Sequence, residues 1–96
     1  MNVSRLLHEK RDLIVALAAK HGAVNVRVFG SVARGDASAA SDLDLLVEMN
    51  PGRTLLDLVG LWQELEELLN CRVHVLTDGG VSPYLRDKIY SEARPL

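Results

Sequence analysis

The chain has 96 residues, of which 48% are apolar, and its 11 basic and 13 acidic side chains give a net charge of −2. This length allows a single domain over residues 1–96, whose small core favours a homo-oligomer or a hetero-complex. Without a basic stripe, a membrane-length apolar run, a signal peptide or a second cysteine, we expect a soluble cytoplasmic protein that binds neither membranes nor nucleic acid directly.

Hydrophobic periodicity predicts the first elements. Apolar residues at helical spacing indicate a helix over residues 4–21, and Gly22 is a natural stop. Alternating valines predict a strand over residues 23–29. A second strand is expected over residues 42–48, because its leucines and Val47 alternate with acidic side chains.

The second half begins with a turn at residues 50–52, which are Asn-Pro-Gly. Thr54 and Asp57 have the spacing of a capping box and predict the start of a helix that runs to Leu69. Trp62 lies on the apolar stripe of this helix, so we expect it in the core.

Residues 72–76 predict a third strand, and a loop follows at residues 78–80. Ser82 and Pro83 then open a final helix, in the favoured order of cap followed by proline. This order of elements predicts an α/β (α+β) domain with a three-stranded sheet and helices packed on one face, so that the other face is free for chemistry.

Asp42 and Asp44 are the first candidate site residues. Side chains two apart on a strand point to the same face and lie roughly 6.6 Å apart along the chain. Two carboxylates on one face repel each other unless a cation neutralises them, and Mg²⁺ with phosphate oxygens is a common partner of such pairs. The pair therefore predicts a divalent metal site.

Gly30–Ser31 follows the first strand and forms the second part of the candidate site. Glycine allows close approach of the backbone to a phosphate, and the serine hydroxyl and nearby N–H groups can donate to its oxygens. Arg34 lies in the same Gly-rich segment and can face the ligand. A Gly-Ser dipeptide alone usually marks only a turn, so its value depends on the acidic pair that follows.

These residues resemble the signature of the minimal nucleotidyltransferases of the polymerase-β-like superfamily, which is Gly-Ser, a spacer and Asp-x-Asp. Here ten residues separate Ser31 from Asp42. The resemblance extends over nearly the whole chain and implies the small nucleotidyltransferase fold with a mixed sheet.

The resemblance also implies roles for the site residues. Gly30, Ser31, Arg34 and Ser41 are assigned to binding of a nucleoside triphosphate, ATP. Asp42 and Asp44 are the expected catalytic ligands of Mg²⁺, and Mn²⁺ is an alternative metal. The family reaction transfers a nucleoside monophosphate and releases pyrophosphate.

His74 occupies the place at which the superfamily carries a third carboxylate. Mg²⁺ prefers oxygen ligands, whereas imidazole suits transition metals. Three functional interpretations of His74 are open: a changed metal preference, a general base, or a weakened enzyme. An ordinary polar residue on a half-exposed strand is an equally good interpretation.

Other polar residues have structural interpretations. We expect Asp78 to form a turn, His21 to lie on the solvated surface, and Tyr90 to serve in packing or at an interface. Glu48 shares the strand face of Asp44 but lies roughly 13 Å farther along, too far for a shared ion.

The leading functional hypothesis is adenylyl transfer from ATP to a protein acceptor, because many members of the resembled family are antitoxins encoded with a HEPN-type ribonuclease toxin. The alternative is a catalytically weak or inactive antitoxin that neutralises this partner by binding. A third hypothesis, transfer to a small molecule such as an antibiotic, is disfavoured because family members that do this carry an added domain.

Overall fold

The computed structural model describes residues 3–36 and 42–96. Within these ranges, no helix combines the length and apolar character needed to cross a membrane. The elements follow the predicted order, with a short helix after the first strand and a 3-10 helix after the third. They are α1 (Val3–Lys20), β1 (Ala23–Phe29), α2 (Gly30–Arg34), β2 (Leu43–Met49), α3 (Leu55–Leu69), β3 (Val73–Thr77), η1 (Asp78–Gly80), α4 (Pro83–Glu92) and β4 (Arg94–Pro95).

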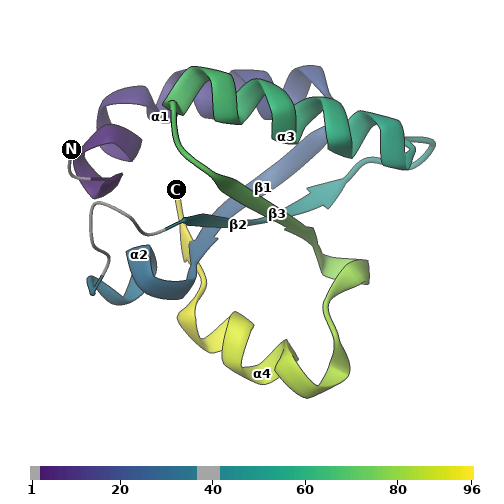
Figure 1. The fold of residues 1–96 in the computed structure, drawn as a ribbon. Coiled ribbons are helices and arrows are strands. Elements are labelled where there is room, and N and C mark those ends of the chain that lie inside the picture. Colours follow the sequence, from purple (N-terminus) through teal and green to yellow (C-terminus); the bar gives the residue numbers. More distant parts are fainter. Residues whose placement is uncertain (1–2, 37–41) are drawn as a thin grey trace.

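The strands form one mixed sheet in the order β3-β2-β1-β4 (Figure 1). β1 runs antiparallel to β2 and β4, whereas β2 and β3 are parallel and are connected through α3. The predicted fold class and mixed sheet are confirmed, but the sheet has four strands instead of three. β4 pairs only Arg94 and Pro95 with β1, and two residues are too few to produce a periodic pattern.

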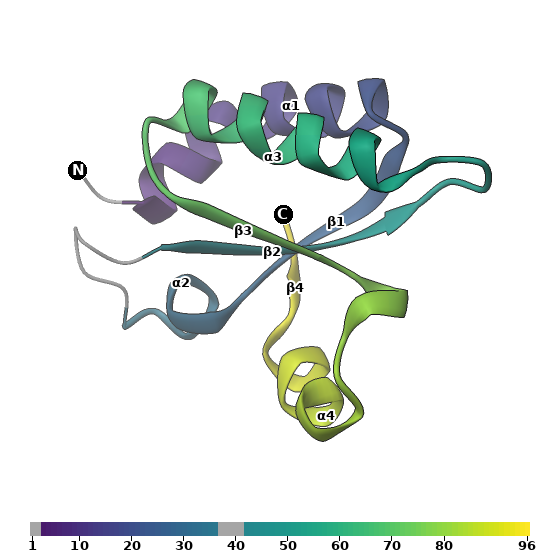
Figure 2. The ribbon, with the colours of Figure 1, turned by 45° about the vertical axis from the view of Figure 1, so that its right-hand side comes forward.

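Helices cover both faces of the sheet, rather than one face as predicted. α1 and α3 lie side by side over one face, and α4 lies over the opposite face (Figures 1 and 2). Leu45 and Val47 pack into the core beneath α1 and α3. Leu46 points the other way, yet it is fully buried with Phe29 and Ile89 under α4. Leu46 therefore lies on the face that was expected to be polar, and α4 packs against it.

The start of α3 confirms the predicted capping box. The backbone N–H of Thr54 donates to Asp57 Oδ2 over 2.9 Å, and the reciprocal bond is also present. Trp62 contradicts its predicted core position, because 42% of it is exposed. The buried side chains of α3 are Leu61, Leu65 and Leu69, and Trp62 lies at the border of this stripe.

His21 also departs from its prediction as a solvated surface residue. Its side chain is only 16% exposed, and its Nε2 lies 3.1 Å from Glu64 Oε2 on α3. A Cβ built on Gly60 would lie 2.9 Å from His21 Cε1, so glycine at this position admits the imidazole between α1 and α3. The glycine inside α3 therefore has a packing reason.

Candidate active site

Three neighbouring strands place the candidate site residues in one row. Phe29, the last residue of β1, pairs with Asp44 of β2, and Asp44 pairs with His74 of β3. Gly30–Ser31 continues directly from Phe29 into α2. The topology thus brings the Gly-Ser turn, the acidic strand and the third-strand histidine to the same end of the sheet.

Gly30 lies against the carboxylate of Asp44. Its φ is +73°, which side chains rarely adopt, and a Cβ at this position would overlap Asp44 Oδ2. Only glycine allows the chain to turn from β1 into α2 so close to this acid.

A pocket of about 530 Å³ opens on the face covered by α4. Its size falls in the range of small-molecule sites. It contains five of the predicted residues, together with side chains of α4 that the sequence did not single out. The lining comprises Phe29, Gly30, Ser31, Arg34, Asp44, His74, Leu76, Leu85, Lys88, Ile89 and Glu92. Ser41, also predicted to bind nucleotide, lies outside the described residues.

Asp44, the member of the predicted acidic pair that lines this pocket, has a shifted pKa. Burial raises the pKa of Asp44 above its usual value, and the nearby charge of Asp42 raises it further, whereas His74 and Arg34 oppose the shift. A half-buried carboxylate beside a second carboxylate gains stability from a bound cation. This arrangement supports the predicted metal-binding role of the acidic pair.

His74 contacts the other acid. Its Nε2 lies 2.9 Å from Asp42 Oδ2. An ionised carboxylate only accepts hydrogen bonds, so an ionised Asp42 would accept from Nε2–H, and in that neutral tautomer of the imidazole Nδ1 would be an acceptor. His74 therefore contacts Asp42, although its side chain is 53% exposed.

The donor set fits Mg²⁺ when a nucleotide is also bound. In the described part of the chain, no three His, Cys, Asp or Glu side chains are grouped closely enough to hold a metal by themselves. Mg²⁺ is commonly held by one or two carboxylates, and phosphate oxygens and water complete its six ligands. Asp42 and Asp44 provide two carboxylates of this kind.

Arg34 lines the pocket, but its guanidinium is engaged by two acids. Its Nε donates to Asp36 Oδ2 over 3.2 Å, and its Nη1 donates to Glu92 Oε1 over 3.0 Å. The second bond connects α2 to the end of α4. In this structure Arg34 therefore joins two walls of the pocket, a role that the sequence did not predict.

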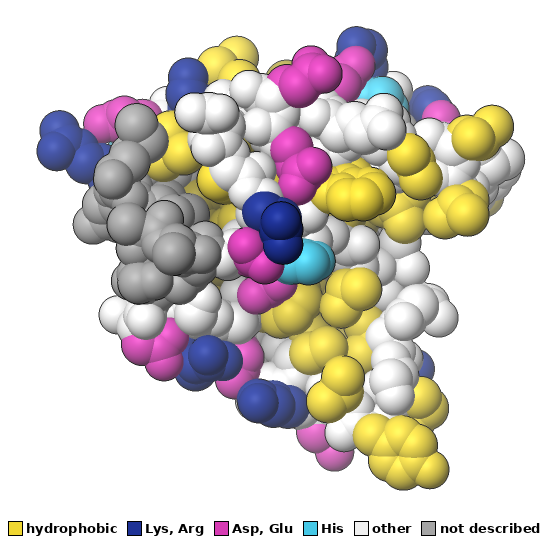
Figure 3. Space-filling model, in the orientation of Figure 1, with side chains coloured by type: hydrophobic (Ala, Val, Ile, Leu, Met, Phe, Trp, Pro, Cys, Tyr) yellow, Lys and Arg dark blue, Asp and Glu magenta, His cyan; other side chains and the backbone are white. Residues whose placement is uncertain are grey.

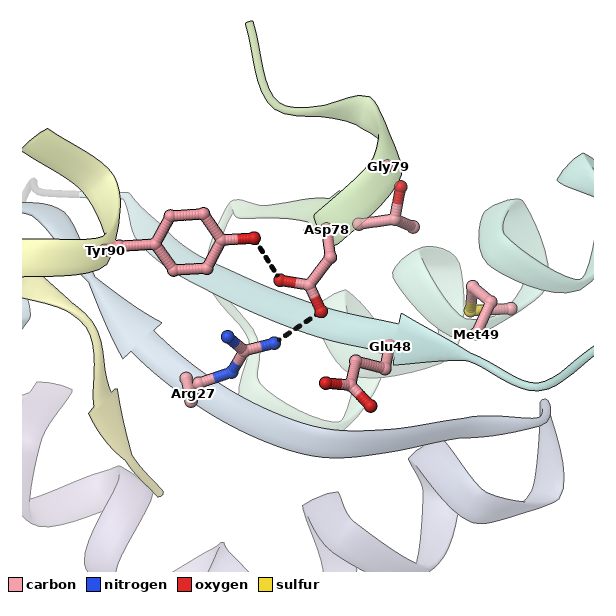
Figure 4. A pocket seen from close by; sticks show the side chains of 7 residues that line it. Arg27, Glu48, Met49, Asp78, Gly79 and Tyr90 are labelled. Carbon is pink, nitrogen blue, oxygen red and sulfur yellow. Dashed lines mark hydrogen bonds and ion pairs between the residues drawn. The ribbon is translucent and has the colours of Figure 1, made fainter. Parts of the chain in front are cut away.

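A second pocket, of about 660 Å³, lies farther along the sheet beside Tyr90 (Figure 4). Tyr90 of α4 donates its hydroxyl to Asp78 Oδ1 over 2.6 Å, and Arg27 of β1 donates to Asp78 Oδ2 over 2.9 Å. Asp78 begins η1 but also joins β1 to α4. These partners are far apart in sequence, so no local pattern could have revealed the cluster.

Apolar side chains border the pocket that contains Gly30, Asp44 and His74 on its β3 side. A smaller pocket of about 290 Å³ between α3 and β3 shares His74 and Leu76 with it. Leu55 and Leu56 at the start of α3 are 73% and 82% exposed. Figure 3 shows apolar side chains gathered beside a histidine and acidic side chains on this face.

Comparisons with known proteins agree with this geometry. Residues 10–96 match the family described as "Nucleotidyltransferase domain". The chain is 44% identical over 87 residues to a proposed protein adenylyltransferase of Methanocaldococcus jannaschii, MJ0435, covering 91% of this chain and 94% of that protein. It is 35% identical over 79 residues to the protein adenylyltransferase MntA of Thermococcus cleftensis, covering 77% and 80% of the two chains.

Solved structures show the same fold. A structure described as a proposed minimal nucleotidyltransferase is 50% identical, with a TM-score of 0.88, and the match covers 100% of this chain and 97% of that one. A toxin–antitoxin complex with AMP-PNP contains a chain that is 20% identical, with a TM-score of 0.75 and coverage of 88% and 69%. The chain belongs to the nucleotidyltransferase domain family, among its minimal members, and is a nucleotidyltransferase.

Proposed function

We propose that this protein transfers the adenylyl group of ATP to a hydroxyl of a partner protein, a HEPN-type ribonuclease toxin, and thereby acts as its antitoxin. One observation carries the proposal: Gly30, Ser31, Asp44 and His74 line a single pocket, and His74 connects it to Asp42. The names of the adenylyltransferase relatives support ATP as the donor and a protein as the acceptor.

Each part of the site has a separate task in binding ATP. The Gly30–Ser31 turn binds phosphate oxygens, because glycine permits close approach and the serine hydroxyl donates. Asp42 and Asp44 hold Mg²⁺, and Mn²⁺ can replace it. The metal supplies positive charge that stabilises the attacking and leaving oxygens of a phosphoryl transfer.

The chemical step forms one P–O bond and breaks another. The acceptor hydroxyl oxygen attacks the α-phosphorus of ATP, the bond between this phosphorus and the bridging oxygen breaks, and pyrophosphate leaves. We assign the hydroxyl proton to His74 Nδ1, since Nε2 is the ring nitrogen that lies against Asp42. Asp42 would stabilise the resulting imidazolium, as a carboxylate does beside a catalytic histidine.

The surroundings of the pocket support a protein acceptor. Leu55 and Leu56 on α3 and Tyr84 and Leu85 on α4 are large apolar side chains that remain more than half exposed. Contiguous exposed apolar surface is typical of protein interaction sites. An acceptor with a complementary apolar surface would cover this region while presenting its hydroxyl to the pocket.

A second candidate is an antitoxin that neutralises its partner by binding without transfer. His74 favours this candidate, because an imidazole stands where the resembled superfamily carries a third carboxylate. The two candidates make the same complex but differ in whether the partner becomes modified.

The deciding experiment uses α-labelled ATP with Mg²⁺ or Mn²⁺, in the presence and absence of the protein encoded by the adjacent gene. The matched control is the Asp42→Asn, Asp44→Asn double variant, which keeps the shapes of both side chains. Label on the partner that disappears with the control establishes adenylyl transfer. A stable complex without label, with full neutralisation by the double variant, would establish the binding antitoxin instead.

A further inference from the structure

α4 contributes a cation to the nucleotide pocket that the sequence motif does not include. We infer that Lys88 binds the phosphate groups of the nucleotide. This inference rests on the proposed function, because it assigns a further binding residue to the same site.

The helical spacing places Lys88 on the pocket side of α4. Leu85, Lys88, Ile89 and Glu92 all line the pocket, and they recur at the three- and four-residue intervals of one helix face. Ile89 is 7% exposed and packs with Leu46 beneath the helix, so this face is fixed against the sheet.

Tyr90 holds the helix from its other side. Its hydroxyl donates to Asp78, which is also bound by Arg27 of β1. Tyr90 lines the second pocket, whereas Lys88 lines the first, so the two residues lie on different sides of α4. The buried Ile89 and the Tyr90–Asp78 bond together limit rotation of α4 and keep Lys88 directed to the nucleotide pocket.

The charge arrangement then distinguishes Lys88 from Arg34. Arg34 is already neutralised by Asp36 and Glu92. Among the residues that the structure describes, Lys88 forms no ion pair, so its ammonium group is available to a ligand. A lysine acts on phosphate as a compact point charge and needs no fixed geometry.

The test compares the ATP–Mg²⁺ affinity of the purified 96-residue chain and its variants by calorimetry. Lys88→Met removes the charge and keeps the length of the side chain, whereas Lys88→Arg keeps the charge. Arg86→Met is the matched control, since it removes one positive charge from the same helix at a residue that does not line the pocket. Inorganic triphosphate is titrated as a second probe, because it lacks the base and ribose.

We expect Lys88→Met to weaken binding of both probes about tenfold, the effect of losing one charge-assisted hydrogen bond. Lys88→Arg and Arg86→Met should bind both probes nearly as the original protein does. Unchanged binding by Lys88→Met, or an equal loss in Lys88→Arg or Arg86→Met, would overturn the role of Lys88 and leave the proposed function intact. Absence of ATP binding by the unmodified protein would instead overturn the proposed function, and the role of Lys88 with it.

Discussion

Gly30 lies so close to Asp44 that a side-chain carbon at position 30 would overlap the carboxylate. Gly30 lies beside Asp44 because the preceding residue, Phe29, pairs with Asp44 across β1 and β2. The two halves of the sequence motif are therefore in direct contact, and the contact depends on a residue without a Cβ. In the proposed function, this contact would place the nucleotide and the metal side by side.

Gly30→Ala should therefore impair both folding and nucleotide binding. Gly35→Ala is the matched control, because Gly35 also has a positive φ, +81°, but nothing lies within 4 Å of its added Cβ. Gly35→Ala should lower the free energy of unfolding only by the backbone cost of a left-handed residue, about 1–2 kcal/mol. Gly30→Ala should lose more stability in urea unfolding and also lose ATP affinity. Equal losses in both variants would show that the contact with Asp44 is unimportant.

Substitutions of His74 should separate its contact with Asp42 from its assigned role as proton acceptor. His74→Gln keeps an N–H that can donate to Asp42, whereas His74→Ala removes it. We expect His74→Ala to weaken Mg²⁺ binding about tenfold, as loss of a partner of a metal ligand commonly does. His74→Gln should keep most of the Mg²⁺ affinity but lose transfer to the partner. Mg²⁺ titrations and label transfer measure the two effects, and normal transfer by His74→Gln would exclude the proton-acceptor role.

Asp78 should make stability depend on pH in the acid range. Burial alone would raise the pKa of Asp78, but the bonds from Arg27 and Tyr90 outweigh it and lower the pKa below its usual value. Its ionised form therefore stabilises the fold above the unfolded pKa, about 3.9, and this contribution is lost as the pH falls through the lower folded value. Asp78→Asn should be less stable by about 1 kcal/mol at neutral pH.

Urea unfolding between pH 7 and pH 2.5 measures this difference. The stability gap between the original protein and Asp78→Asn should narrow below about pH 4, where the unfolded carboxylate becomes protonated. If the stability difference between the two proteins stayed constant over this range, Asp78 would not be the source of the pH dependence.

Gly60 and His21 should behave as a coupled pair. Alanine inside a helix is more stable than glycine by about 1 kcal/mol, but in this chain Gly60→Ala must displace the imidazole of His21 from Glu64. In a His21→Ala background the same substitution should therefore stabilise the protein more than it does alone. Thermal unfolding of the two single variants and the double variant measures the coupling. Additive effects would show that the two residues do not constrain each other.

The exposed apolar surface should matter for the partner and not for the nucleotide. Leu55→Glu on α3 should weaken the complex with the partner, because Leu55 lines the smaller pocket between α3 and β3 and the substitution places a charge in a desolvated interface. Leu13→Glu is the control, since Leu13 is also more than half exposed but lies on α1, which contributes no residue to either pocket beside the site. Calorimetry with the partner and with ATP separates the two functions. Equal partner binding by both variants would place the interface elsewhere.

The strength of local patterns explains which elements were predictable. Alternating apolar residues in β1 and β2 identified both strands, and the Thr54–Asp57 pair identified the start of α3, because each depends on neighbours within a few residues. β4 was missed, since it consists of two residues whose strand conformation depends on pairing with β1. Trp62 has helical spacing with buried leucines, but periodicity does not define where the stripe ends.

The sequence by itself determined the order of the elements, the spacing of Gly30–Ser31 from Asp42 and Asp44, and the family to which that spacing points. Only the tertiary structure decided that α4 covers the second face of the sheet, that His74 binds Asp42, and that Arg34 pairs with Glu92. The physical reason is that backbone periodicity assigns each side chain to a face, whereas packing of distant elements decides what meets it there. Leu46 illustrates this, because its direction follows from the strand and its burial follows from α4.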